Sequence, residues 1–131
     1  MTDAIQQGAQ KKLLTETELE LMNLLWHLGE GSVRDVISAL PQDRKLAYTS
    51  VSTMLRILEQ KGVVVARKVG RGHVYKPQLV REEYQARSVH HLVDKVFDGA
   101  STVLVRRLLD SRDLSDSDLK AIQAMLDERL D

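Results

Sequence analysis

The stretch that most constrains the fold of this chain is Ala47–Lys61, which is followed by Gly62. At 3.6 residues per turn its apolar side chains share one helical face: Val51, Met54, Leu55 and Leu58. The opposite face carries short hydroxyls, one arginine and one acid: Thr49, Ser52, Thr53, Arg56, Glu59 and Gln60. We expect Thr49 or a neighbour to cap this helix and Gly62 to end it. One face should be buried, and the chemistry of the other suits a DNA groove.

Two shorter helices are predicted before this central helix. Thr15 and Glu18 have the spacing of a capping box, which predicts a helix over Glu16–Leu28. Ser32 can cap a second helix over Val33–Leu40, which Pro41 prevents from continuing. The side chains expected to face the core are Leu19, Met22, Leu25, Trp26, Val36, Ile37 and Leu40.

A β-hairpin is predicted after the central helix. Val63–Val65 and His73–Tyr75 read as strands, and the basic tip between them is flanked by Gly70 and Gly72. Three helices followed by a hairpin is the order of a winged helix-turn-helix domain, with the hairpin as the wing. The predicted fold is therefore mainly α with a small β-hairpin: a winged helix-turn-helix DNA-binding domain plus a C-terminal helical dimerisation segment.

From Arg81 onward, apolar residues again recur at the period of a helix. Helices are expected over about residues 82–97, around 103–109, and after a capping box of Ser115 with Asp118. Because this segment is short, its helices have too few apolar residues to bury one another fully. We therefore predict that they pack against a second copy in a homodimer. A monomeric cap on the winged domain is the alternative. The predicted dimerisation residues are Leu92, Val96, Phe97, Leu104, Leu108, Ile122 and Leu126. The predicted domains are a mobile arm (1–14), the winged domain (15–78) and the dimerisation domain (79–131).

Charge is distributed unevenly along the chain. Between Arg44 and Lys76 there are eight basic residues and a single acid, whereas the remainder from Arg81 to Asp131 has eight basic and eleven acidic residues. A local positive field favours a polyanion, although a solvated basic surface without a partner would have the same composition. The candidate DNA-binding residues are Thr49, Ser50, Ser52, Thr53 and Arg56 in the central helix, and Arg67, Lys68, Arg71 and His73 in the wing.

Other classes of function find little support. The chain contains no cysteine, which excludes disulfide frameworks, thiolate zinc sites and cysteine nucleophiles. There is no glycine-rich phosphate loop or nucleophile elbow, and the adjacent His90 and His91 diverge by about 100° on a helix. We expect no enzyme activity, no metal and no cofactor. Without a membrane-spanning run or a secretion signal, a cytoplasmic protein with no membrane insertion is expected.

Several of these stretches resemble one known family, the BlaI/MecI/CopY family of penicillinase-type transcriptional repressors. The resemblance spans Leu14 to Leu130, and its motifs are LTETELELMNLLW, SVRDVISAL, LAYTSVSTMLRILEQKG, GRGHVYKP and VFDG. It implies a homodimeric winged-helix repressor bound to a double-stranded, palindromic DNA operator. It also implies a membrane-bound sensor protease as a partner, which would release the repressor by cutting its dimerisation segment.

The chain departs from this family at two points. The Cys-x-Cys pair of the copper-responsive branch is missing, so metal-controlled release by thiolates is not available. The Asn–Phe bond cut in the β-lactam branch corresponds here to Arg107 and Leu108, and neither residue matches.

Winged helices also serve as protein-interaction modules without sequence-specific DNA binding, which is the alternative function. The hydroxyls and Arg56 on the central helix favour DNA, because protein-docking helices usually expose aromatic anchors.

Overall fold

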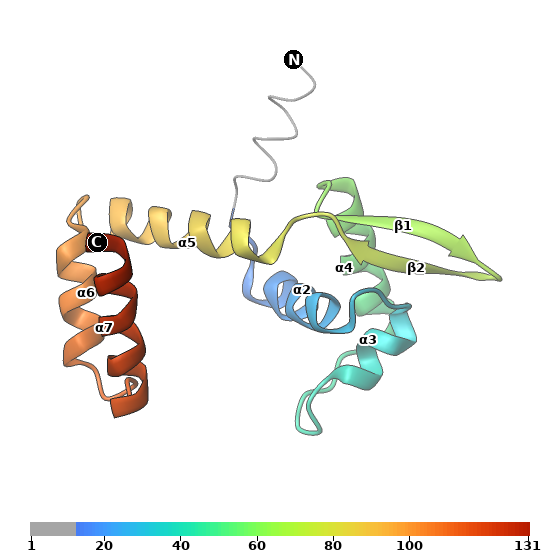
Figure 1. The fold of residues 1–131 in the computed structure, drawn as a ribbon. Coiled ribbons are helices and arrows are strands. Elements are labelled where there is room, and N and C mark those ends of the chain that lie inside the picture. Colours follow the sequence, from blue (N-terminus) through green and yellow to red (C-terminus); the bar gives the residue numbers. More distant parts are fainter. Residues whose placement is uncertain (1–12) are drawn as a thin grey trace, which may run out of the picture. The chain divides into compact units, whose positions relative to one another are not determined.

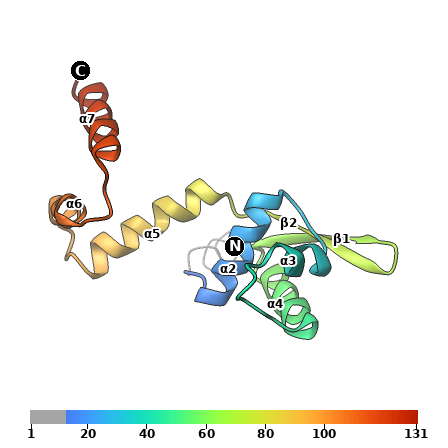
Figure 2. The ribbon, with the colours of Figure 1, turned by 90° about the horizontal axis from the view of Figure 1, so that it is seen from below.

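The computed structural model describes residues 13–131, so the predicted N-terminal arm lies almost entirely outside the described residues. The described chain forms helices and one hairpin (Figure 1 and Figure 2). In chain order the elements are α2 (Glu16–Leu28), α3 (Val33–Ala39), α4 (Tyr48–Gln60), β1 (Val64–Val69), β2 (Gly72–Pro77), α5 (Arg81–Lys95), α6 (Ser101–Asp110) and α7 (Asp116–Leu130). The fold is thus mainly helical with a two-stranded antiparallel hairpin, as predicted.

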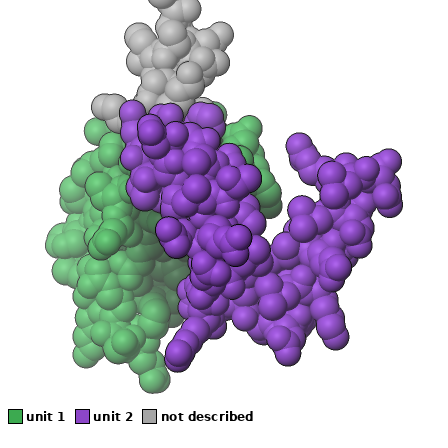
Figure 3. Space-filling view, turned by 90° about the vertical axis from the view of Figure 1, so that its left-hand side faces the viewer, with its two compact units in different colours: residues 1–87 green, residues 88–131 purple. Residues whose placement is uncertain are grey.

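The chain divides into two compact units, coloured separately in Figure 3. The first extends to Arg87 and the second comprises Ser88–Asp131. We call the described part of the first, residues 13–87, the winged unit, and the second the C-terminal unit. Helix α5 begins in the winged unit and ends in the C-terminal unit.

Local capping signals set the starts of α2 and α3. The Thr15 hydroxyl accepts from the Glu18 N–H, and the Glu18 carboxylate accepts from the Thr15 N–H, which confirms the predicted capping box. Ser32 caps α3 as predicted, and Asp35 completes a second box there. Helix α3 ends at Ala39, with Leu40 already extended before Pro41. Both predicted helices are therefore confirmed to within one residue at each end.

Helix α4 begins without a side-chain cap. Its N-cap residue is Ala47, which has no acceptor, so the predicted capping by Thr49 or a neighbour is wrong. Thr49 lies inside the first turn, where its own backbone is already helical. The predicted end is confirmed: Lys61 is the C-cap residue, and Gly62 follows with a positive φ of 77°. Glycine adopts that conformation without the steric penalty of a Cβ.

The hairpin is longer than the sequence predicted. Strands β1 and β2 pair from Val64 with Pro77 to Val69 with Gly72. The two-residue turn between them is Gly70 and Arg71, with Gly70 at a φ of 60°. Gly31 adds an antiparallel bridge to β2, because its N–H and C=O both bond to the backbone of Tyr75 at 2.9 and 2.8 Å. This bridge ties the α2–α3 connection to the wing.

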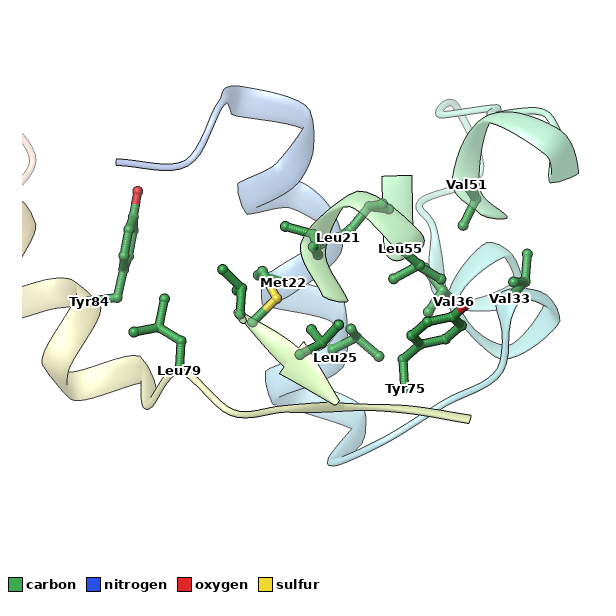
Figure 4. Close-up of a cluster of buried hydrophobic side chains, with 13 residues drawn as sticks. Leu21, Met22, Leu25, Val33, Val36, Val51, Leu55, Tyr75, Leu79 and Tyr84 are labelled. Atoms are coloured by element: carbon green, nitrogen blue, oxygen red, sulfur yellow. The ribbon is translucent and has the colours of Figure 1, made fainter. Parts of the chain in front are cut away.

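The core of the winged unit contains residues from α2, α3, α4, both strands and the start of α5 (Figure 4). Of the residues expected to face inward, Met22, Leu25 and Val36 are fully buried, and Leu19, Trp26 and Ile37 pack against the cluster. Leu21 was not predicted but is also fully buried. The other core residues are Val33, Val51, Leu55, Leu58, Val63, Val64, Tyr75, Leu79 and Tyr84.

The core extends past residue 78, where the predicted winged domain ended. Leu79 and Tyr84 are 3% and 6% exposed. The Trp26 indole N–H donates to the Leu79 carbonyl at 2.9 Å, and the Leu14 N–H donates to the Tyr84 hydroxyl at 3.0 Å. The first turn of α5 is therefore an integral part of the packing of the winged unit.

A partly buried ion pair joins the start of α2 to the end of α4. The Lys61 ammonium lies 2.6 Å from the carboxylate of Glu18, whose side chain is only 6% exposed. Burial raises the pKa of Glu18, but the bonds from Lys61 and Thr15 outweigh it, so the pKa is lowered from its ordinary value. Lys61 thus pairs with an acid that lies 43 positions away in the sequence.

Glu18→Gln is expected to lower the free energy of unfolding at pH 7 by about 1–3 kcal/mol, because Lys61 and Thr15 lose a charged acceptor. A carboxyl whose pKa is depressed in the folded state stabilises above its unfolded pKa and loses that contribution as pH falls through the folded pKa. The difference between variant and wild type should therefore shrink from pH 7 to about pH 3. Urea unfolding at both pH values measures this difference. Glu16→Gln, a substitution at an exposed position, is the control. An equal difference at both pH values would contradict the assignment.

The C-terminal unit has no buried core of its own. Helix α5 ends at Lys95, two residues before the predicted Phe97, and the chain turns through Asp98 and Gly99 at positive φ. Ser115 and Asp118 form the predicted capping box of α7. Neither α6 nor α7 contains a buried residue. Both helices are therefore left with apolar side chains in contact with solvent.

Candidate nucleic-acid interface

Helix α4 presents its polar face outward from a fully buried support. Val51, Leu55 and Leu58 have no exposed surface. On the other side Thr49, Ser50, Thr53 and Arg56 are exposed, and Ser52 is half-buried. Five predicted residues thus lie on one helix whose orientation is fixed by the core. Four of them are directly accessible.

The first turn of α4 differs from those of three other helices in the described chain. Helices α2, α3 and α7 each begin with a capping box, whereas the N-cap residue of α4, Ala47, makes no side-chain cap hydrogen bond, as is also true of Ala100 before α6. The first N–H groups of a helix have no intrahelical acceptor. Those of α4 therefore remain available to an acceptor from outside the chain.

All four predicted wing residues are exposed, but they differ in their surroundings. The register places Lys68 opposite His73, and Arg71 lies in the turn. Arg67 forms an ion pair with Glu30, which raises the pKa of Arg67 and lowers that of Glu30. Arg67 is thus partly neutralised within the chain. None of the ion pairs among residues 13–131 involves Arg71.

The folded chain reduces the positive field that the sequence suggested. Acids of α2 and its C-terminal loop pair with three of the eight basic residues: Glu20 with Arg44, Glu18 with Lys61 and Glu30 with Arg67. These pairings join residues 24, 43 and 37 positions apart, so a count along the sequence could not include them. The cations left over are Lys45, Arg56, Lys68, Arg71 and Lys76.

Tyr48 and Arg34, which lie near the start of α4, were not among the predicted site residues. Tyr48 is 51% exposed, whereas Tyr75 is packed in the core at 3% exposed. The guanidinium carbon of Arg34, from α3, lies 5.8 Å from the centre of the Tyr48 ring. With Ile37 and Ser38 these two side chains line an open hollow of about 450 Å³. Spacing along the sequence gave no signal for this contact between helices.

The predicted dimerisation residues are mostly accessible in the single chain. Leu92, Val96, Leu108 and Leu126 are 38%, 67%, 49% and 55% exposed. Phe97, Leu104 and Ile122 are half-buried. Side chains of α6 and α7 together line a largely apolar groove of about 490 Å³, formed by Val105, Leu109, Leu119, Ile122, Gln123, Met125, Leu126 and Arg129.

A metal site needs clustered ligands, and a membrane span needs a long apolar helix. No group of three or more His, Asp or Glu side chains in residues 13–131 is placed to hold a metal ion. Among the helices of that same range, none combines the length and the apolar character needed to cross a bilayer.

The fold and the exposed face of α4 define the class of protein. Helices α3 and α4 form a helix-turn-helix, and the basic hairpin β1–β2 is the wing of a winged helix-turn-helix protein. The chain belongs to the Penicillinase repressor family, whose model matches residues 14–128. The family consists of DNA-binding transcriptional repressors and not of enzymes. The resemblance noted in the sequence is therefore confirmed.

Individual relatives agree with this membership. The chain is 25% identical to the penicillinase repressor of Bacillus licheniformis over 115 residues, which cover 88% of this chain and 90% of the relative. It is 39% identical to the transcriptional regulator BlaI of Mycobacterium tuberculosis over 74 residues, 56% of this chain and 54% of that protein. The solution structure of the DNA-binding domain of the repressor BlaI is 30% identical, covering 54% of this chain and 87% of that one, with a TM-score of 0.48.

Proposed function

We propose that this protein is a homodimeric repressor that binds a palindromic operator in double-stranded DNA. The observation that carries the proposal is α4, which has one fully buried face and a second face of exposed hydroxyls and Arg56. A helix of this kind fits the major groove, where such side chains can bond to base edges and phosphates. A phosphate oxygen would also satisfy the uncapped first turn. A solved structure that is 29% identical over 56% of this chain is that of the monomeric form of Bacillus licheniformis BlaI in complex with the blaP half-operator.

Dimerisation supplies the second half of the operator contact. The C-terminal unit exposes an apolar groove and has no buried residue in α6 or α7, so a second copy is the partner that would cover it. Two linked winged units make the second half-site contact effectively intramolecular. In a two-fold dimer, the central helices would enter successive major grooves about one helical turn apart.

Release would follow from loss of the dimer. Cutting the C-terminal unit separates two half-site contacts without changing any residue of the winged unit. We propose α6 as the segment that a membrane-bound sensor protease would cut, because this helix contains Arg107 and Leu108, which correspond to the bond cut in the β-lactam branch and are exposed in the single chain. Their side chains differ from the Asn–Phe pair of the β-lactam branch, so a protease acting here would need a different specificity.

Selection of bound duplexes from a random DNA pool tests the proposed function. Full-length protein should recover a palindrome whose half-sites lie about one helical turn apart. The selection reports activity, symmetry and spacing together. Recovery of no consensus sequence would contradict repressor function and favour a protein-interaction module.

The wing is tested by Arg71→Ala. Arg71 is exposed in the hairpin turn, so its loss should weaken binding to the selected operator and to random DNA by similar factors. The slope of log affinity against log salt should fall by about one, as expected for one phosphate contact. Fluorescence anisotropy across a salt series measures both, with the exposed Arg112→Ala as a charge-matched control. An unchanged slope would remove the tip of the wing from the interface.

A further inference from the structure

The hollow lined by Arg34, Ile37, Ser38 and Tyr48 joins the exposed side of α3 to the first turn of α4. Arg34 is exposed and is held over the Tyr48 ring at 5.8 Å, within the range of a cation–π contact. Neither side chain belongs to the core cluster. The stability of the core therefore does not explain why an arginine and an aromatic ring are paired at this surface.

We infer that this hollow binds the backbone of one DNA strand, with Arg34 on a phosphate and the Tyr48 ring against the adjacent deoxyribose. The inference rests on the proposed function and adds two residues to its interface. When the second helix of a helix-turn-helix lies in the major groove, the helix before it crosses the DNA backbone. Here that helix is α3, and Arg34 is on its exposed side.

The chemistry of the hollow suits a sugar-phosphate strand. A guanidinium donates two parallel N–H bonds to phosphate, and its stacking on Tyr48 reduces the freedom that it must lose on binding. Ser38 adds a hydroxyl donor, and Ile37 provides an apolar wall for the sugar. The nearest acid in sequence, Asp35, accepts from the Ser32 N–H at 2.9 Å. No ion pair within residues 13–131 involves Arg34.

Substitutions in the full-length chain test this assignment. Arg34→Ala should weaken binding about tenfold, the loss expected for a charged hydrogen bond. The loss should be equal on the palindrome recovered by selection and on a random duplex, and the salt slope should fall by about one. Tyr48→Ala should weaken both about threefold through the lost cation–π contact, and Tyr48→Phe should bind like wild type.

Arg81→Ala is the matched control. Arg81 carries the same charge and lies 5.7 Å from the centre of the Trp26 ring, so it loses the same kind of contact. It stands at the start of α5, outside the helix-turn-helix, and should retain wild-type affinity. Thermal unfolding followed by circular dichroism checks that each variant is folded at the titration temperature. Arg34→Lys keeps the positive charge but lacks the forked guanidinium, so its loss of DNA affinity should be intermediate.

The outcomes separate this inference from the function on which it rests. If wild type binds the palindrome and Arg34→Ala behaves like Arg81→Ala, the hollow has no part in binding although the proposed function stands. A loss confined to the palindrome, with an unchanged salt slope, would also overturn the phosphate contact. If wild type shows no binding to either duplex, both proposals fail.

Discussion

Ile122→Asp combined with Leu126→Asp is expected to convert the proposed dimer to a monomer and to lower operator affinity by about 100-fold or more. Both residues line the apolar groove of α6 and α7, where a partner helix would bury the new carboxylates without a counter-charge. No contact of α4 or of the wing is altered. The loss should therefore reflect only the missing second half-site.

Sedimentation equilibrium and operator titration measure the two effects together. Ser117→Asp is the control, since it places one carboxylate of the same kind at an exposed position in the first turn of α7. It should remain dimeric with wild-type affinity. Binding of the double variant to random DNA should fall far less than its binding to operator. A double variant that remained dimeric would rule out this groove as the interface.

Leu55→Ala is expected to lower the free energy of unfolding by about 2–5 kcal/mol. Leu55 is fully buried at the centre of α4, and its truncation leaves a cavity among the side chains that hold this helix in place. The exposed residues of α4 are untouched. The variant should therefore keep operator specificity under conditions in which it is folded.

Ile57→Ala provides the comparison for Leu55→Ala. Ile57 is two residues away on the same helix and is 38% exposed, so its truncation should cost much less. Urea unfolding of the two variants gives the difference directly. Equal losses would mean that the buried and outward faces of α4 have been assigned incorrectly.

Signals confined to a few neighbouring residues predicted the elements well. The capping boxes at Thr15 and Ser115 work through contacts three residues apart, and they are present in the structure. Gly62 ends α4 through its own backbone conformation. The buried face of α4 followed from helical period alone, because one side of that helix packs on the core and the other does not. Such features depend on local geometry, which the sequence contains directly.

Features that depend on distant residues could not be predicted in this way. Leu21 is buried because α2 packs against α3 and α4 as well as β2, so its apolar surface is wider than one stripe. The cap of α4 was predicted wrongly. Hydroxyl side chains near the start of a helix often cap it, but this helix starts directly after Ala47, so the hydroxyl residues that follow lie inside its first turn. The pairing of Lys61 with Glu18 joins residues 43 positions apart and leaves no local pattern.

The candidate interface shows the same division. The hydroxyls and Arg56 of α4 were identified because they share one helical face, and the structure exposes all of them except Ser52, which is half-buried. Arg34 was missed because its partner Tyr48 belongs to the next helix. The sequence also could not show that Glu30 partly neutralises Arg67 in the wing. Only the folded arrangement of α3, α4, the α2–α3 connection and the hairpin brings these groups together.

Repeating the DNA selection with Thr53→Ala combined with Arg56→Ala tests the central claim most directly. Both side chains are exposed on the outward face of α4, and neither contributes to the core cluster. The double variant should fold and dimerise like wild type, yet recover a consensus that is relaxed or altered within each half-site while its spacing is kept. Recovery of the unchanged wild-type consensus would show that another surface reads the DNA.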